Sequence, residues 1–177
     1  MAYYYTQTTL FSLPIYILAS NQGLMYVSTD EQTDEQFFSY IKTKFNLEQA
    51  ECERAIEQLE PYVKQLKQFE LGQPIDHSQL SYDLRGTMFQ KSVWEALLTI
   101  PYGETTTYGA IASQIGNVKA VRAVGRAIGA NPILLFVPCH RVIGKDGSLT
   151  GFSSGLALKA QWLDFENKHR LKGTNDC

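Results

Sequence analysis

Apolar and polar positions follow two different periods in the first half of the chain. Two short apolar stretches, residues 15–19 and 24–28, flank the turn-forming residues Asn21-Gln22-Gly23. This arrangement predicts a β-hairpin. Beyond it, apolar residues recur at spacings of three and four, which predicts helices. These residues are Phe37, Phe38, Ile41, Ala55, Ile56, Leu59, Val63 and Leu66. We therefore expect a small α/β unit in which Pro61 begins or kinks the second helix.

A change in composition separates this unit from the rest of the chain. Residues 71–84 lose the helical period and become rich in Gly, Pro, Asp, Ser and Gln, which indicates a connector. We expect an N-terminal α/β domain with its connector over residues 1–83 and a C-terminal domain over residues 84–177. Near the start of the second domain, Thr87 and Gln90 have the spacing of a helix capping box. The apolar face of that helix is Phe89, Val93, Leu97 and Ile100, and Pro101-Tyr102-Gly103 should end it.

The next stretch has the punctuation of a helix-turn-helix. Thr107 can cap a short helix, Gly116 can end it, and Asn117 can cap a second helix. The second helix should carry an apolar side, an opposite basic side and a strip of small residues between them. The three sets are Val121, Val124 and Ile128; Lys119, Arg122 and Arg126; and Ala120, Ala123 and Ala127. Such a helix can approach a DNA groove closely. A surface helix packed by alanines is the alternative.

Length and composition exclude several classes of protein. The chain has 177 residues, 44% of them hydrophobic, which is enough for a buried core and excludes a disordered or fibrous protein. The apolar run at residues 133–137 is far shorter than the roughly 20 residues that cross a bilayer, so we expect no membrane association. The start of the chain lacks a basic-then-apolar signal segment, and the three cysteines, Cys52, Cys139 and Cys177, are scattered, which favours the cytoplasm. Neither Cys52 nor His77 has a partner at metal-ligand spacing, so no metal site is expected.

The small net charge of −2 conceals two oppositely charged halves. Residues 1–83 contain 5 Lys or Arg and 12 Asp or Glu, whereas residues 84–177 contain 11 and 6. An anionic partner would therefore meet the second half. Chance segregation of charge on a solvated surface is the alternative.

The segment from Asn131 to Gly144 delivers a thiol and an imidazole together at the end of an apolar run. A free cysteine has a pKa of about 8.5, so a nucleophilic cysteine needs a nearby base or cation to ionise at neutral pH. His140 is the obvious base for Cys139. Because adjacent side chains point apart in an extended strand, a bridging water is a reasonable relay. A packed core cysteine beside a hydrogen-bonded histidine is the purely structural alternative.

The residues around this pair resemble a known family. Pro138-Cys139-His140-Arg141-Val142 resembles the active-site motif of the O6-alkylguanine-DNA alkyltransferases, also called methylated-DNA–protein-cysteine methyltransferases. Further matches run through the second half in the same order: Ile100-Pro101-Tyr102-Gly103-Glu104, Tyr108, Lys119-Ala120-Val121-Arg122-Ala123-Val124-Gly125, Asn131-Pro132 and Gly155-Leu156-Ala157. The resemblance implies a ribonuclease-H-like α/β N-terminal domain, followed by a mostly helical C-terminal domain with a helix-turn-helix.

The resemblance also implies a role for each candidate catalytic residue. Cys139 would accept the alkyl group, His140 would act through water as its base, and Glu166 would hold the other imidazole nitrogen. A carboxylate at that position favours the imidazolium and therefore the thiolate. Tyr108 would crowd the adjoining phosphate and hydrogen-bond the base. Asn131 would be the hinge between the DNA helix and the active-site turn.

Further residues are implied to bind DNA and the extruded base. Arg122 would fill the gap that the nucleotide leaves, Phe152 would stack on the base, and Ser153 would donate a backbone N–H to it. The other implied DNA contacts are Tyr108, Lys119, Ala120, Ala123 and Arg126. The remaining implied pocket residues are Ile128, Leu134 and Val142. Phe152 replaces a tyrosine of some relatives and Ser154 a glycine, so the width of the pocket stays open.

The implied activity is the stoichiometric repair of double-stranded DNA. Each monomer would take one alkyl group from O6-alkylguanine, or from O4-alkylthymine, without a metal or an organic cofactor. Two rival classes are a helix-turn-helix regulator without chemistry and a cysteine hydrolase that acts on an acyl group. A regulator would keep its function in Cys139→Ala. A hydrolase needs an oxyanion hole, for which the sequence carries no separate signal.

Overall fold

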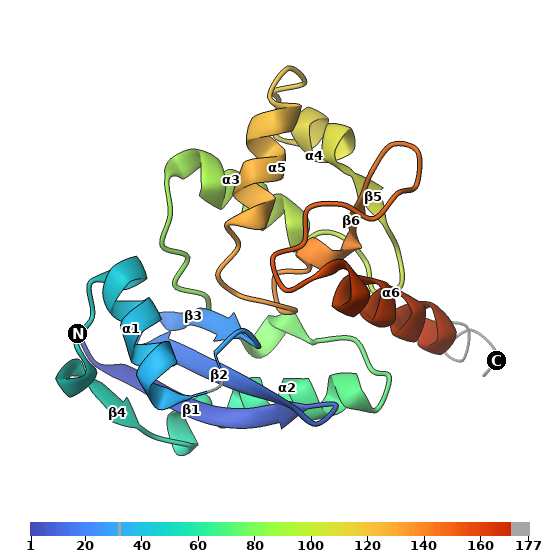
Figure 1. Cartoon of the computed structure of the whole chain (residues 1–177). Helices are drawn as coiled ribbons and strands as arrows, with labels where there is room; N and C mark the ends of the chain where they lie inside the picture. The colour runs from blue at the N-terminus through green and yellow to red at the C-terminus, as the bar shows by residue number, and fades with distance from the viewer. Residues whose placement is uncertain (32, 171–177) are drawn as a thin grey trace. The chain divides into compact units, whose positions relative to one another are not determined.

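The computed structural model describes residues 1–31 and 33–170. The chain divides into two compact units, Met1–Arg85 and Gly86–Cys177. The mixed α/β composition expected from the sequence is confirmed, because a small sheet and helices make up the first unit and helices dominate the second (Figure 1). Cys177 lies outside the described residues. Within the described residues, no helix is long and apolar enough to cross a bilayer.

A four-stranded sheet forms the centre of the first unit. Its strands are β1 (Tyr3–Leu10), β2 (Leu13–Ser20), β3 (Gly23–Ser28) and β4 (Cys52–Arg54), in the order β3-β2-β1-β4. The β2–β3 hairpin predicted from the apolar pattern is confirmed. β1 pairs with β2 in antiparallel register and with β4 in parallel register. β1 and β4 were not predicted, because the run Tyr3–Leu10 mixes tyrosines with Thr and Gln and β4 is very short.

Two helices cover opposite faces of this sheet (Figure 1). α1 (Asp34–Phe45) begins where the Thr33 side chain accepts the Gln36 N–H. Its buried side joins an aromatic cluster with the strands, in which Phe37 stacks on Tyr16 at 4.6 Å between ring centroids. α2 (Glu60–Glu70) buries Leu66 and Phe69 against the other face. The alternation of side chains along β2 supplies apolar residues to both faces.

The structure corrects the predicted start of the second helix. Pro61 lies in the first turn of α2, as expected, since its ring fits that position and no backbone N–H is lost there. Ala55 and Ile56, however, precede the helix, and Ile56 is 67% exposed. A short 3₁₀ turn, Gln49–Glu51, precedes β4. Another 3₁₀ turn, Glu57–Leu59, links Ala55 and Ile56 to α2. The helical spacing of these two residues was therefore coincidental.

The connector returns to the sheet at its end. It is irregular apart from the 3₁₀ turn His77–Gln79. The Leu24 N–H donates to the Ser81 carbonyl, and the Asp83 N–H donates to the Leu24 carbonyl, at 2.9 Å each. Gly23 is required at this point, because it has a φ of +145° and a Cβ there would lie 2.4 Å from the Ser81 carbonyl carbon.

The described part of the second unit, residues 86–170, contains four α-helices and one very short sheet. Its elements are α3 (Met88–Leu97), β5 (Thr106–Thr107), α4 (Tyr108–Gln114), α5 (Val121–Gly129), β6 (Val142–Ile143) and α6 (Leu156–Arg170). The capping box of Thr87 and Gln90 is present at α3 as predicted. β5 and β6 pair in parallel, which brings the strand after residue 141 beside the start of α4.

α4 and α5 follow the predicted punctuation except at one position. Thr107 caps α4, and Gly116 follows it with a φ of +75°. Asn117 does not cap α5, contrary to expectation. It opens a turn in which its carbonyl accepts the Ala120 N–H at 3.0 Å, and α5 begins only at Val121. Lys119 and Ala120 consequently precede the helix, and Val121, predicted to be buried, is 39% exposed at its first position.

A buried tryptophan ties α3 to α5. The Trp94 side chain is 1% exposed, and its Nε1–H donates to the Ala127 carbonyl at 2.8 Å. This hydrogen bond satisfies both the indole and a carbonyl near the C-terminal end of α5, so the bond and the apolar burial of the ring should both stabilise the second unit.

We expect Trp94→Phe to lower the free energy of unfolding of the second unit by about 1–3 kcal/mol, because a buried carbonyl loses its donor and the smaller ring leaves space. Urea unfolding followed by circular dichroism measures the change. Met88→Ala is the control on the same helix, since Met88 is 88% exposed. An equal effect of the two substitutions would contradict a structural role for the indole hydrogen bond.

Candidate active site

Tight turns carry the chain from α5 to Cys139. Leu135 has a φ of +70°, which is uncommon for a residue with a side chain. The Phe136 N–H donates to the Leu134 carbonyl at 2.9 Å, and the Cys139 N–H donates to the Val137 carbonyl at 2.8 Å. Both bonds close three-residue turns. The apolar run at residues 133–137 is therefore coiled into the core, rather than extended as a strand.

Asn131 fixes these turns from the end of α5. Its Nδ2–H donates to the Val137 carbonyl at 2.9 Å, and its Oδ1 accepts the Ile133 N–H at 3.0 Å. Asn131 also lowers the pKa of the Cys139 thiol. One side chain thus fixes the turn from the end of the helix and favours the ionised form of the sulfur.

Cys139 and His140 lie in a 3₁₀ turn, Cys139–Arg141. Cys139 is 4% exposed and His140 is completely buried. Burial raises the pKa of the Cys139 thiol, and Asn131 and the positive charge of Lys159 counteract part of that increase. The resting sulfur is therefore favoured as a neutral thiol in the buried site.

A carboxylate holds one nitrogen of His140. His140 Nε2 lies 2.7 Å from Glu166 Oε1, and both side chains are completely buried. His140 Nδ1 is also buried, and no described residue hydrogen-bonds it. Burial lowers the pKa of His140, while Glu166 raises it. The imidazole is thus held as a neutral base whose second nitrogen is available within the core.

Arg141 shares the same carboxylate. Its Nε and Nη2 donate to Glu166 at 2.9 Å, and its Nη1 donates to the Ile100 carbonyl at 2.7 Å. The Gly103 N–H donates to Glu166 Oε2 at 3.1 Å. Burial alone would raise the pKa of Glu166, but His140 and Arg141 lower it to about 2. Glu166 is therefore ionised throughout the neutral range.

Tyr108 connects α4 to the loop that precedes α6. Its hydroxyl donates to the Thr150 carbonyl at 2.8 Å, and the next residue, Gly151, has no room for a Cβ, which would lie 2.9 Å from that hydroxyl. A cavity of about 380 Å³ opens between this loop and α5. Its lining residues are Gly125, Gly129, Gly151, Phe152, Ser153 and Leu156.

The other residues implied for the pocket occupy different positions. Ile128, Leu134 and Val142 are buried in the core of the second unit and do not line this cavity. Phe152 is buried at its edge and packs against Trp162, which itself contacts the His140 ring. Ser153 is exposed. The structure thus places the loop residues together at the cavity and the aliphatic residues behind it.

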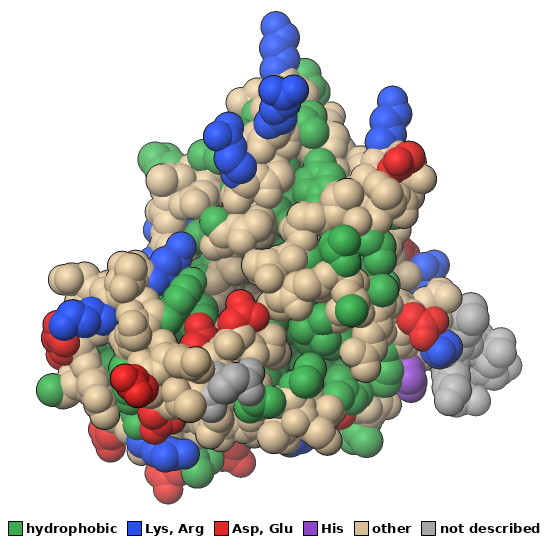
Figure 2. Space-filling view, in the orientation of Figure 1, with side chains coloured by type: hydrophobic (Ala, Val, Ile, Leu, Met, Phe, Trp, Pro, Cys, Tyr) green, Lys and Arg blue, Asp and Glu red, His purple; other side chains and the backbone are tan. Residues whose placement is uncertain are grey.

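The basic residues implied to bind DNA lie on the surface around α5. Lys119, Arg122 and Arg126 are exposed, and Ala120 and Ala123 beside them are partly buried. Figure 2 shows Lys and Arg side chains projecting over this helix. Gly125 lies against the Tyr108 ring, where an added Cβ would be 3.8 Å from the nearest ring carbon. Small residues and cations therefore share one accessible surface.

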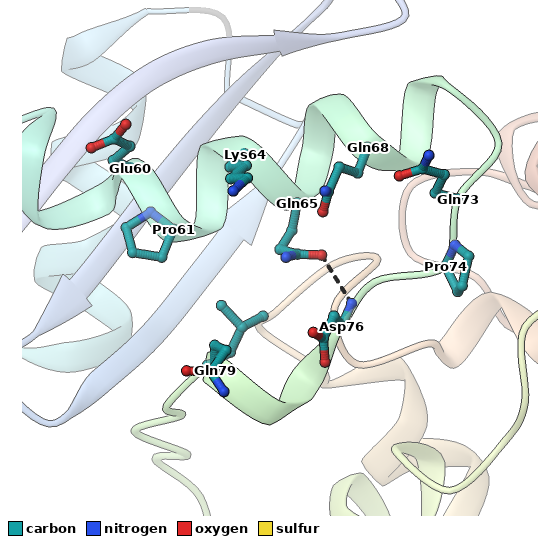
Figure 3. A pocket seen from close by; sticks show the side chains of 10 residues that line it. Glu60, Pro61, Lys64, Gln65, Gln68, Gln73, Pro74, Asp76 and Gln79 are labelled. Carbon is teal, nitrogen blue, oxygen red and sulfur yellow. Dashed lines mark hydrogen bonds between the residues drawn. The ribbon is translucent and has the colours of Figure 1, made fainter.

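The first unit holds a larger polar cavity without reactive side chains. It has a volume of about 600 Å³ and lies between α2 and the connector (Figure 3). Gln65 Oε1 accepts the Asp76 N–H there at 2.9 Å. The lining residues are Glu60, Pro61, Lys64, Gln65, Gln68, Gln73, Pro74, Asp76, Gln79 and Leu80, none of them a thiol or an imidazole. Among the described residues, no group of three or more His, Cys, Asp and Glu side chains could hold a metal ion.

Reasoning from the sequence missed two charged residues of the site, Arg141 and Lys159. Arg141 was read only as part of the motif, and Lys159 received no role. A signal for Lys159 was present, since it precedes Glu166 by seven residues and therefore lies on the same face of a helix. The buried residues of α6 are in fact Lys159, Trp162 and Glu166.

Known proteins share this sequence and fold. The family model of the 6-O-methylguanine DNA methyltransferase DNA-binding domain matches residues 88–168. The inducible methylated-DNA–protein-cysteine methyltransferase of Bacillus subtilis is 41% identical over 153 residues, which cover 86% of this chain and 84% of that protein. The corresponding protein of Methanosarcina acetivorans is 44% identical over 160 residues, which cover 86% and 91%.

Solved structures agree with these relatives. The O6-methylguanine methyltransferase of Mycobacterium tuberculosis is similar with a TM-score of 0.73 and 38% identity, over 95% of this chain and 93% of that one. A structure of OGT from the same organism in complex with DNA has a TM-score of 0.75 and 37% identity, over 96% and 94%. The similarity therefore extends over both units, and the chain belongs to the methylated-DNA–protein-cysteine methyltransferase family.

Proposed function

We propose that this protein repairs double-stranded DNA by moving the alkyl group of O6-alkylguanine, and also of O4-alkylthymine, directly to Cys139. The observation that carries the proposal is the buried contact of Glu166 with His140, which lies in the same 3₁₀ turn as the buried Cys139 thiol. Membership of the methyltransferase family supports the same reaction. Tyr108, Asn131 and Arg122 assist the reaction as the family resemblance implies.

A proton relay through one water would activate the sulfur. His140 Nδ1 is buried without a hydrogen bond to any described residue, and it belongs to the residue next to Cys139. A water between the two groups would pass the thiol proton to the imidazole, and Glu166 would stabilise the imidazolium that forms. The thiolate then attacks the alkyl carbon, the bond from that carbon to the guanine oxygen breaks, and guanine leaves as an anion. A proton delivered to the base, with Tyr108 as a hydrogen-bond donor, eases its departure.

The product explains why one molecule would repair one lesion. A thioether is chemically stable, and the proposed site contains no group assigned to cleave it. Each molecule would therefore be consumed in a single reaction. The reaction as written balances without a metal or an organic cofactor, and it requires a reduced Cys139, which a reducing cytoplasm would maintain.

The second unit would bind the DNA. We take α4 and α5 as a helix-turn-helix whose small and basic residues approach the duplex, and the first unit as a ribonuclease-H-like domain. Extruding a nucleotide costs a few kcal/mol in lost stacking, and Arg122 would occupy the space that it leaves. Phe152 would stack on the extruded base, and the Ser153 N–H would bind it. Nothing in this scheme requires more than a monomer.

We expect one methyl group per molecule, located on Cys139, after incubation with a duplex that contains O6-methylguanine. Intact mass and peptide mapping measure the transfer. Cys139→Ala should accept none. Cys52→Ser is the matched control and should react normally, since burial and the charge of Glu51 raise the pKa of Cys52 to about 11. Repeated conversion of substrate by one molecule, or an unmodified Cys139, would refute the proposal.

Arg122→Ala should slow the repair of duplex DNA at least tenfold while changing the reaction with free O6-benzylguanine by less than about twofold, because only the duplex requires extrusion. Single-turnover rates with the two substrates measure the difference. Lys91→Ala, which removes an exposed cation of α3, is the control. Equal losses on both substrates would show that Arg122 does not assist extrusion.

Glu166→Gln should lower the free energy of unfolding at neutral pH by about 3–5 kcal/mol, because Arg141 would keep a buried charge without its counterion. The Glu166 pKa of about 2 lies below its ordinary value, so its contribution is complete above about pH 4.3 and is lost as the pH falls toward 2. Urea unfolding as a function of pH measures both effects. The exposed Glu95→Gln should change little, and a substituted protein that retained the acid dependence of the native chain would contradict this role.

A further inference from the structure

One buried charged residue of the second unit has no part in the scheme above. α6 buries Lys159, Trp162 and Glu166 on one face, and Glu166 forms an ion pair with Arg141 and a hydrogen bond with His140. Lys159 is 0% exposed. Its Nζ donates to the Val142 carbonyl at 2.5 Å and to the Thr150 carbonyl at 2.8 Å. These two contacts hold the ammonium group inside the core, where the loss of hydration disfavours its charged form.

No described carboxylate forms an ion pair with Lys159. A buried charge is ordinarily kept only beside an opposite charge or several hydrogen-bond partners. Burial lowers the pKa of Lys159, and the one group that raises it is the negative charge of Cys139. The same interaction acts in the other direction and lowers the pKa of the Cys139 thiol. Among the described residues, Cys139 is thus the group whose ionised form would offset the charge of this ammonium.

The two carbonyls that Lys159 binds belong to different parts of the site. Val142 begins β6, three residues after Cys139. Thr150 begins the loop that carries Phe152 and Ser153, and its carbonyl also accepts the Tyr108 hydroxyl at 2.8 Å. One ammonium therefore connects the strand that follows the thiol to the loop at the edge of the cavity.

We propose that Lys159 is a positioning residue for alkyl transfer, whose buried ammonium ties the Thr150 loop to the strand after Cys139 and serves as the counterion of the Cys139 thiolate. This inference rests on the proposed function. Lys159 touches neither the alkyl group nor the base, so it acts through the sulfur and the loop. It adds a fixed cation to the transient imidazolium of His140.

The surrounding charges determine the direction of the expected pH effect. The positive charge of Lys159 lowers the pKa of the Cys139 thiol, and it lowers the pKa of His140 by charge repulsion. Tyr108, from α4, shares the Thr150 carbonyl with Lys159. Arg141 and Glu166 bind one another beside His140. Removing the ammonium takes away an interaction that favours the thiolate, so Cys139 should ionise at a higher pH.

The experiment follows the reaction of Cys139 with iodoacetamide as a function of pH, resolved by peptide mass. In Lys159→Met the midpoint should rise by about one pH unit, and the rate at neutral pH should fall about tenfold. Lys159→Arg keeps the charge and should restore both values to within about twofold of the native protein. Lys168→Met is the matched control on α6, because Lys168 is 69% exposed in a surface pair with Asp164. Free O6-benzylguanine should give the same order of rates.

Several outcomes would overturn the inference. A folded Lys159→Met protein with the native midpoint would show that the lysine only stabilises the structure, even if its melting temperature falls. If that variant does not fold, Lys159→Arg decides, since a raised midpoint in spite of the retained charge would contradict the counterion role. Iodoacetamide requires no DNA, so these results are independent of the proposed repair. Failure of the native protein to accept a methyl group from O6-methylguanine DNA would instead refute the proposed function.

Discussion

The buried carboxylate of Glu166 is the constraint on which the arrangement of the second unit depends. It accepts hydrogen bonds from the side chains of His140 and Arg141 and from the Gly103 N–H. These donors come from the 3₁₀ turn after Pro138 and from the loop after α3, so a single group on α6 fixes two distant segments of the chain. A buried carboxylate with fewer partners would be expelled or protonated. The geometry of the site and the stability of the unit therefore have the same origin.

The surroundings of the Cys139 thiol favour its neutral form at rest but lower the cost of ionising it. Burial favours the neutral forms of both Cys139 and His140, whereas Asn131 and Lys159 favour the Cys139 thiolate and Glu166 favours the charged form of His140. Because these effects oppose one another, the free-energy difference between the neutral pair and the thiolate–imidazolium pair is smaller than the cost of ionising an isolated buried group. A neutral resting thiol in a nearly closed site is protected from casual oxidation, which attacks exposed thiolates. In the proposed single-turnover reaction, this protection would preserve the one thiol that accepts the alkyl group.

The sequence predicted the parts of this protein that follow from local chemistry. Two apolar stretches and a Gly-containing turn were sufficient for the hairpin, and Thr87, Thr107 and Gly116 marked helix ends because capping depends on nearby residues. Strand β1 was missed because its polar residues hide the pattern and because Tyr5 is buried by two phenylalanines of α1, a contact between distant residues. The start of α5 was misplaced because Asn117 can either cap a helix or open a turn, and only the packing of α5 decides between them.

In the candidate site, too, residues adjacent in the sequence could be predicted together, whereas residues brought together by folding could not. Cys139 and His140 are neighbours in the sequence, so their pairing was visible in the motif. Glu166 entered only through the family resemblance, although the helical period then required Lys159 to lie on the same buried face. With Arg141 and Lys159 as cations, Glu166 as an anion and Cys139 and His140 neutral, these groups carry one net positive charge. In the proposed reaction, transfer of the proton from sulfur to imidazole would leave that charge unchanged. The new negative charge would form where Lys159 favours it, and the new positive charge would form beside Glu166. Each charge formed in this step would therefore be stabilised by a fixed charge of the opposite sign.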